Sequence, residues 1–222
     1  MKIKKIIRSK RKSIAMHINN EALLIVRAPF HVSEEAINQV VLRYKKRLEK
    51  IQKEVQARNL KFNKKEFING ERFLYLGNYF PLKLVDNQEI RLNFENEFFL
   101  SKKYLDYAKD IFIIWYKRRA NEIIPQRVRL YAQKRGLEYN KVNITHAKKR
   151  WGSCSHQGNL SFTWRLIMAP LPIIDSVVVH ELIHLEVKNH SKEFWDKVKI
   201  LDPKYREHKE WLKNNGSLLR FE

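Results

Sequence analysis

The stretch VVVHELIHLEVKNHSKEFW, residues 177–195, combines two features that conflict in an ordinary buried helix. Apolar residues occupy nearly every side of its first half, which is typical of a helix in a protein core. His180, Glu181 and His184 interrupt that run, and burying two imidazoles and a carboxylate without partners is costly. A metal ion would satisfy all three groups, the histidines directly and Glu181 through a water molecule.

The spacing of these residues favours zinc. His180 and His184 are four residues apart, so on a helix they lie on one face, within about 40° of each other. Glu181 is rotated by about 100° from His180 and can approach a metal-bound water without being a ligand. The HExxH pattern at residues 180–184 therefore predicts two histidine ligands and a glutamate that acts as general base.

A catalytic zinc site needs a third protein ligand. His190 is the nearest candidate, but it would point away from His184 if the helix continued unbroken. We expect the helix to end within residues 187–189, with Asn189 in the left-handed conformation, and Ser191 to cap the next helix. The competing third ligands are Glu193, Glu207, Glu210 and His146.

Residues 1–100 predict strands and one long helix. Three strand patterns precede Ser33, which is a suitable N-cap for a helix over residues 34–59. Further strand patterns follow between residues 72 and 101, and they predict an antiparallel meander. This region is therefore expected to be rich in β-structure.

Residues 101–222 are mainly helical in pattern. Apolar residues recur at helical spacing from Tyr104 onward, and Pro125 is expected to kink or divide this helix. Two strand patterns follow at residues 141–147 and 159–167, joined by a hairpin-like connection.

Several segments together resemble a known family. RWGSCS at residues 150–155, WRL at 164–166, VVVHELIH at 177–184 and NHSKEFW at 189–195 resemble the YgjP-like metallopeptidase family. The resemblance covers most of the chain, and its specific part is residues 150–195. It implies a zincin-like catalytic domain, related to the SprT and WLM-type proteases. It also implies that His180, His184 and His190 are zinc ligands and that Glu181 is the catalytic base.

One position departs from a related group. Val187 stands where the metzincins, which share this third-ligand spacing, place a glycine, and this argues against a metzincin proper. The expected fold is α+β, with N-terminal antiparallel strands and a long helix packed on a zincin-like helical catalytic domain that has a short β-sheet. We expect a β-rich region at residues 1–100 and a zinc metallohydrolase region, most simply a metallopeptidase, at residues 101–222.

Other residues are weaker candidates. Arg150 and Arg165 could contact an oxyanion or an anionic group of a substrate, because guanidinium groups bind such oxygens well. By analogy with zincins, the strand at residues 159–167 is expected to lie at a sheet edge and to pair with a peptide. Cys154, the only cysteine, excludes an intramolecular disulfide and is interpreted as a packed thiol.

The formal net charge is +21, which favours attraction to polyanions. A peptide or protein substrate is expected, and two alternatives stay open. One is a metal-dependent hydrolase of nucleotide phosphoanhydrides, and the other is a nucleic-acid-associated binding module with secondary protease activity. Neither a glycine-rich phosphate loop nor a known nucleic-acid-binding motif supports them.

The amino-terminal stretch is basic but lacks the apolar run of a signal peptide, and no uncharged stretch reaches membrane-spanning length. We therefore expect a cytoplasmic protein without membrane insertion. The sequence leaves the oligomeric state open.

Overall fold

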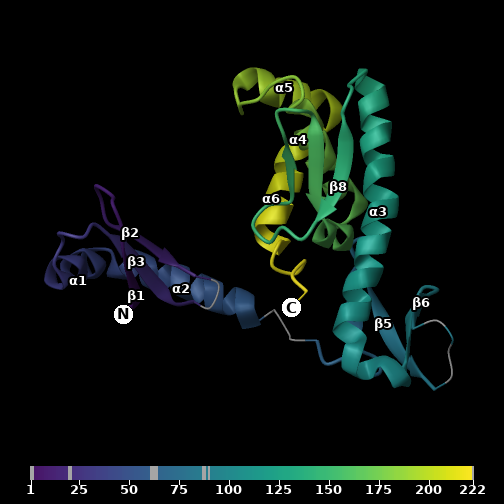
Figure 1. Cartoon of the computed structure of the whole chain (residues 1–222), viewed down its shortest axis with the longest axis horizontal. Helices are drawn as coiled ribbons and strands as arrows, with labels where there is room; N and C mark the ends of the chain where they lie inside the picture. Colours follow the sequence, from purple (N-terminus) through teal and green to yellow (C-terminus); the bar gives the residue numbers. More distant parts are fainter. Residues whose placement is uncertain (1–2, 20–21, 61–64, 87–88, 90, 222) are drawn as a thin grey trace. The chain divides into compact units, whose positions relative to one another are not determined.

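The structure, a computed structural model, describes residues 3–19, 22–60, 65–86, 89 and 91–221. The chain forms two compact units, Met1–Asn63 and Lys64–Glu222. Both units combine helices with small sheets (Figure 1), which confirms the α+β class. The strands between residues 72 and 101 lie in the second unit.

The first unit contains a three-stranded sheet and two helices. The sheet order is β1-β3-β2, and its strands are β1 (Ile3–Arg8), β2 (Ala15–Ile18) and β3 (Leu24–Ala28). β1 pairs with β3 in parallel, whereas antiparallel pairing was expected throughout. The buried side chains Leu24, Val26 and Ala28 alternate along β3 and face the core of this unit.

Ser33 caps the first helix as predicted, because its hydroxyl accepts a hydrogen bond from the backbone N–H of Ala36 at 3.2 Å. The single helix expected over residues 34–59 is divided at Tyr44 into α1 (Glu34–Arg43) and α2 (Lys45–Leu60). Tyr44 has the dihedral angles φ −102° and ψ 11°, outside the helical region, so the helix axis can change there.

The second unit begins with a four-stranded sheet of order β4-β5-β7-β6. Its strands are β4 (Arg72–Tyr75), β5 (Asn78–Val85), β6 (Leu92–Phe94) and β7 (Phe98–Ser101). β5 pairs with β7 in parallel, so the prediction of an antiparallel meander is wrong. The rings of Phe73 and Phe98 pack on Phe112, with centroids 4.2 and 5.1 Å away, and so fix the sheet to the following helix.

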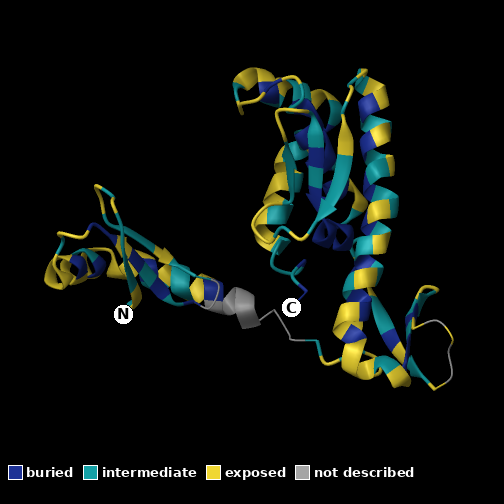
Figure 2. Ribbon diagram, viewed as in Figure 1, coloured by how far each residue is buried: buried dark blue, intermediate teal, exposed yellow. Residues whose placement is uncertain are grey.

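That helix, α3 (Ala108–Arg135), follows the 3-10 turn η1 (Lys102–Tyr107) and continues through Pro125. Of the kink or division predicted at Pro125, the division is therefore wrong. Ile124 and Val128 are both fully buried on the two sides of the proline, and their burial holds the helix together across it. Figure 2 shows buried and exposed residues alternating along α3, as expected for a helix with one face on the core.

A second sheet of order β8-β10-β9 follows. Its strands are β8 (Lys141–Thr145), β9 (Gly152–Cys154) and β10 (Asn159–Thr163). The strand expected at the edge, β10, is therefore central, and β9 forms the edge. The strand pattern also ends early, because Trp164–Met168 form a 3-10 helix, η2.

Three helices complete the chain: α4 (Leu171–Ile183), α5 (Lys192–Leu201) and α6 (Tyr205–Asn215). α4 packs against α3, α5, α6 and β9. Arg127 on α3 donates two hydrogen bonds to Asp175 on α4, each 2.6 Å long. The turn between β4 and β5 holds the end of η2, which leads into α4. The N–H groups of Leu76 and Gly77 donate to the carbonyls of Ile167 and Met168, each at 3.0 Å.

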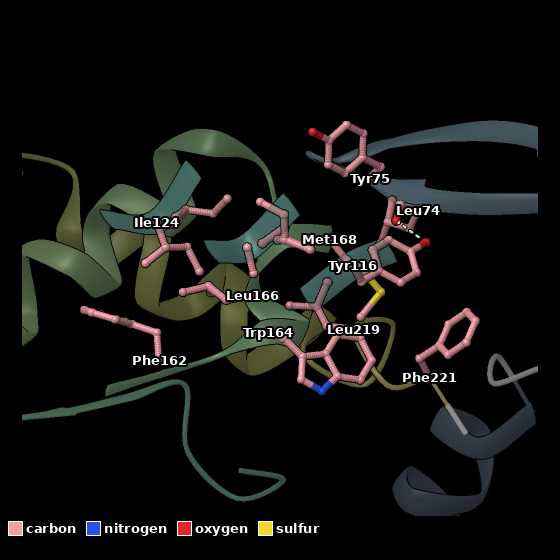
Figure 3. Packing of buried hydrophobic residues seen from close by; sticks show 14 of the residues in the cluster. Leu74, Tyr75, Tyr116, Ile124, Phe162, Trp164, Leu166, Met168, Leu219 and Phe221 are labelled. Atoms are coloured by element: carbon pink, nitrogen blue, oxygen red, sulfur yellow. Dashed lines mark hydrogen bonds between the residues drawn. The ribbon is translucent and has the colours of Figure 1, made fainter. Parts of the chain in front are cut away.

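The main core joins the two sheets of this unit. Trp164 is fully buried and stacks on Tyr116, whose hydroxyl donates to the Leu74 carbonyl at 2.8 Å (Figure 3). Phe221, near the carboxyl end, packs against both rings. None of the helices within the described residues combines the length and apolarity that crossing a membrane requires.

Candidate metal centre

The chain after α4 turns back toward the helix within a few residues. α4 ends at Ile183, earlier than predicted, and the N–H of Val187 donates to the Ile183 carbonyl at 2.9 Å. His184 Nδ1–H donates to the Val187 carbonyl at 3.0 Å, which orients the imidazole ring and leaves its Nε2 free to bind. This turn brings His190 back to the end of α4.

Asn189 does not adopt the predicted left-handed conformation. Its side-chain oxygen accepts a hydrogen bond from the N–H of Ser191 at 3.1 Å instead. Ser191 is the N-cap of α5, as predicted, and its hydroxyl accepts from the N–H of Phe194. The turn thus needs neither a glycine nor a left-handed residue at Val187 or Asn189.

The structure brings three of the predicted site residues together. Ring nitrogens of His180, His184 and His190 all lie within 4.8 Å of one another. The Nε2 atoms of His180 and His190 are 3.1 Å apart. Within the described part of the chain, no other group of three or more histidine, cysteine or acidic residues is placed to hold a metal ion.

The competing third ligands lie outside this group. His146 accepts a hydrogen bond from the indole N–H of Trp164 at 3.3 Å, and Glu193 forms an ion pair with Lys197. Glu207 and Glu210 lie on α6 and are exposed.

Phe194 supports the three histidines from the core side. It is fully buried, and its ring centroid lies 5.0, 4.5 and 4.8 Å from those of His180, His184 and His190. Trp195 stacks on His190 with an interplanar angle of 26°. The imidazoles are therefore held by packing as well as by the backbone turn.

Glu181 is buried against the edge strand β9. A Cβ atom at Gly152 would lie only 2.7 Å from Glu181 Oε1, so the glycine leaves the space that the carboxylate occupies. Burial raises the pKa of Glu181 to about 7, while the charge of Arg150 and a hydrogen bond from the Cys154 backbone oppose this rise. The carboxylate is thus confined between α4 and β9.

The surroundings of His180 and His190 favour the neutral form of both rings. Burial, followed by the charges of His184, His190 and Lys209, lowers the pKa of His180 to about 4. Burial also lowers the pKa of His190, with smaller contributions from His184 and Lys209. Neutral imidazoles have a free lone pair, which is the form that binds metals.

A cavity of about 580 Å³ opens beside this group. His180, Glu181 and His190 line it together with Arg150, one of the two predicted arginines. Arg165 lies elsewhere: it is 7% exposed, stacks on Trp164 at 4.4 Å and donates to the His146 carbonyl. Cys154 is half-buried on β9, where burial raises the pKa of its thiol.

Sequence reasoning missed the contribution of α6. Tyr205, Lys209 and Lys213 from this helix line the same cavity. Lys209 and Lys213 are four residues apart and so share one helix face, but nothing local to α6 shows that this face meets the end of α4. Trp151 and Trp195 supply aromatic walls.

Comparisons with known proteins found two similar structures and one matching family model. Two crystal structures of metallopeptidase zymogens resemble part of the chain. One is abylysin of Pyrococcus abyssi, with 19% identity, a TM-score of 0.39, and coverage of 44% of this chain and 97% of that chain. The other is jannalysin of Methanocaldococcus jannaschii, with 20% identity, a TM-score of 0.38, and coverage of 43% and 96%. These similarities are too weak to support a conclusion about the fold or the function of this chain.

No curated protein matches the chain. A family model described as the YgjP-like metallopeptidase domain matches residues 12–215, which include parts of both compact units and the whole histidine group. This match confirms the resemblance drawn from residues 150–195. The chain belongs to the YgjP-like metallopeptidase family.

Proposed function

We propose that this metallopeptidase is a zinc enzyme in which His180, His184 and His190 hold the ion and Glu181 is the general base. The observation that carries the proposal is the approach of three imidazole nitrogens to within 4.8 Å of one another, beside a buried carboxylate and an open cavity. Three protein ligands with one open position are the pattern of a catalytic zinc site.

The donor set fits zinc. Tetrahedral zinc with bonds of about 2.0–2.1 Å separates its ligand nitrogens by roughly 3.3 Å. The His180 and His190 nitrogens, 3.1 Å apart, are already near that spacing, and a ring nitrogen of His184 lies within 4.8 Å of both. Imidazole nitrogens without a thiolate or a carboxylate ligand favour zinc over calcium or magnesium.

Bound zinc would supply Lewis acidity and lower the pKa of a bound water. Glu181 would accept a proton as the water attacks the peptide carbonyl, and would return it to the leaving amine. Its place between α4 and β9 positions the carboxylate, because Gly152 leaves the space that it occupies against the strand and the Cys154 backbone donates to it. His184 is oriented by the Val187 carbonyl.

The edge strand β9 is suited to hold an extended peptide. It pairs with β10 on one side only, and Gly152 lines the cavity. Backbone groups on an exposed edge can pair with a substrate strand and so place its peptide bonds along the cleft. This assigns to β9 the role that the sequence suggested for residues 159–167.

The direct test is Glu181→Gln, which keeps the shape and removes the base. We expect turnover of a fluorogenic peptide library to fall about a thousandfold, while zinc content stays at the wild-type level. Glu186→Gln is the matched control, because Glu186 forms ion pairs with Arg135 and Lys197 away from the cavity. Full activity in Glu181→Gln, or a protein that binds no zinc, would contradict the proposal.

The same preparations should be given nucleoside triphosphates. Phosphate release without peptide cleavage would favour the phosphoanhydride alternative and overturn the assignment of a peptide bond.

A further inference from the structure

We propose that the cleft selects substrates that carry a carboxylate close to the bond that is cut, and that Lys209 and Lys213 hold this carboxylate with help from Arg150. The inference rests on the peptidase function proposed above and names the substrate class of that site. An acidic side chain and a free chain terminus offer the same chemistry.

Lys209 lies at the aromatic wall of the metal centre. Its Nζ atom is 4.8 Å from the ring centroid of Trp195, and Trp195 in turn stacks on His190. The ring of Tyr205 also stacks on Trp195, with the two ring centroids 5.1 Å apart. The ammonium group is therefore close to where the reacting peptide bond would lie.

The charges on the cavity wall do not balance. Three cations, Arg150, Lys209 and Lys213, line the cavity with a single carboxylate, Glu181. Glu181 is buried and assigned to proton transfer, and a dipositive metal ion would increase the excess of positive charge. A ligand that brings a negative charge would relieve the repulsion between these groups.

The two lysines lack an acidic partner among the described residues. Within the described part of the chain, neither Lys209 nor Lys213 forms an ion pair, although Glu210 lies three residues from Lys213 on the same helix. Lys197 on α5, by contrast, is paired with both Glu186 and Glu193. Lys209 and Lys213 are exposed, so an incoming carboxylate can reach them.

The walls match a peptide better than a free anion. Trp151, Trp195 and Leu212 line the same cavity and offer apolar surface to the residues that flank the carboxylate. Arg150 precedes β9, whereas the lysines project from α6, so the cations come from two different elements that border one cavity. An acidic peptide lying along β9 would satisfy both kinds of surface.

The test measures binding to the zinc-loaded full chain carrying Glu181→Gln, so that no probe is cut. The probes are fluorescein-labelled octapeptides of alanine and leucine with one glutamate, placed at each position in turn, and the same peptides with glutamine. Each is made with a free carboxyl end and with a carboxamide. We expect the best glutamate peptide, or the free acid, to bind about tenfold more tightly than its neutral match.

Adding both Lys209→Met and Lys213→Met to the Glu181→Gln chain should reduce the preference for the charged peptides to less than about twofold. Lys192→Met and Lys199→Met, which remove the same charge from exposed positions of α5 outside the cavity, should retain it. A preference carried by the glutamate identifies a side-chain carboxylate, and one carried only by the free acid identifies a chain terminus. Both outcomes support the inference.

Equal binding of the charged and neutral peptides would overturn it, as would a preference that survives the loss of both lysines. Displacement of every peptide by inorganic pyrophosphate, without any preference for glutamate, would also overturn it and assign the cations to phosphate. Failure of the proposed peptidase function can be distinguished from failure of this inference. A wild-type chain that cuts no peptide but binds glutamate peptides selectively refutes the peptidase function and leaves only carboxylate binding by the two lysines.

Discussion

The substitution Gly152→Ala should lower the peptidase activity of this protein strongly and its stability only slightly. The new methyl group would lie 2.6 Å from Glu181 Cγ, 2.7 Å from Oε1 and 2.9 Å from Cδ. Glu181 is only 6% exposed and lies against β9, so the added methyl group and the carboxylate cannot both keep these positions. Either the carboxylate or the edge strand β9 must move.

The size of the effect follows from these distances. Restoring a 3.4 Å contact to Cγ requires a displacement of roughly 0.8 Å, and a misplacement of about 1 Å near reacting groups costs up to about a hundredfold in rate. We therefore expect kcat/KM to fall about fiftyfold, or about 2.3 kcal/mol of transition-state stabilisation. The free energy of unfolding should fall by only about 1 kcal/mol, since one carboxylate can shift outward.

The assay is kcat/KM on a fluorogenic peptide, with zinc content and denaturant unfolding measured on the same preparation. Ser153→Ala is the control, because it changes the same strand without adding volume beside Glu181. Zinc content should stay at the wild-type level, since the three histidines are untouched. Wild-type kcat/KM in Gly152→Ala would show that the contact between β9 and Glu181 does not position the base, and would refute the reasoning.

The remaining predictions concern the ligands and their support. His190→Ala should raise the dissociation constant for zinc by about a hundredfold or more, as measured by chelator competition; unchanged affinity would exclude it as a ligand. Phe194→Ala removes the buried ring under the histidines and should lower the free energy of unfolding by about 3–5 kcal/mol, so a change below about 1 kcal/mol in urea unfolding would contradict this packing role. Asp175→Asn removes the negative charge and one of the two oxygens that accept from Arg127, and should cost about 2 kcal/mol. Glu122→Gln, at a more exposed ion pair, should lower the free energy of unfolding by less than about 0.5 kcal/mol. Equal losses of unfolding free energy in these two variants would contradict the proposed role of the Arg127–Asp175 pair in holding α3 against α4.

The residues that could be assigned from sequence are those with local signals. His180, Glu181 and His184 needed only the geometry of one helix, and Ser191 needed only the chemistry of a helix start. The structure brings His190 to them and caps α5 at Ser191. These features depend on residues a few positions apart, which is the range over which backbone geometry can be calculated.

The failures depend on contacts that are distant in sequence. Interrupting a helix with a proline costs about 3 kcal/mol, yet burying Ile124 and Val128 stabilises by about 1.5–3 kcal/mol each, and α3 continues through Pro125. The parallel pairing of β5 with β7 is likewise decided by the packing of Phe73 and Phe98 on α3 rather than by turn chemistry.

The cavity shows the same limit. Arg165 and Arg150 carry the same charge in neighbouring motifs, but only the fold reveals that Arg165 is buried on Trp164 while Arg150 reaches the cavity. Lys209 gave no local sign of its position, because the contact between α6 and α4 sets it. Its place in the site became visible only with the tertiary structure.

The bonds from Leu76 and Gly77 to the carbonyls of Ile167 and Met168 bear on how the enzyme is assembled during synthesis. The turn between β4 and β5 leaves the ribosome long before the segment that it binds, so this support is synthesised before α4. The metal centre is then among the last parts to form, since it also needs His190 and Phe194. A fragment that begins after β7 would leave those two carbonyls without their partners, and we expect it to be translated but to fold poorly. Peptidase activity in this chain is thereby tied to completion of nearly all of its second unit.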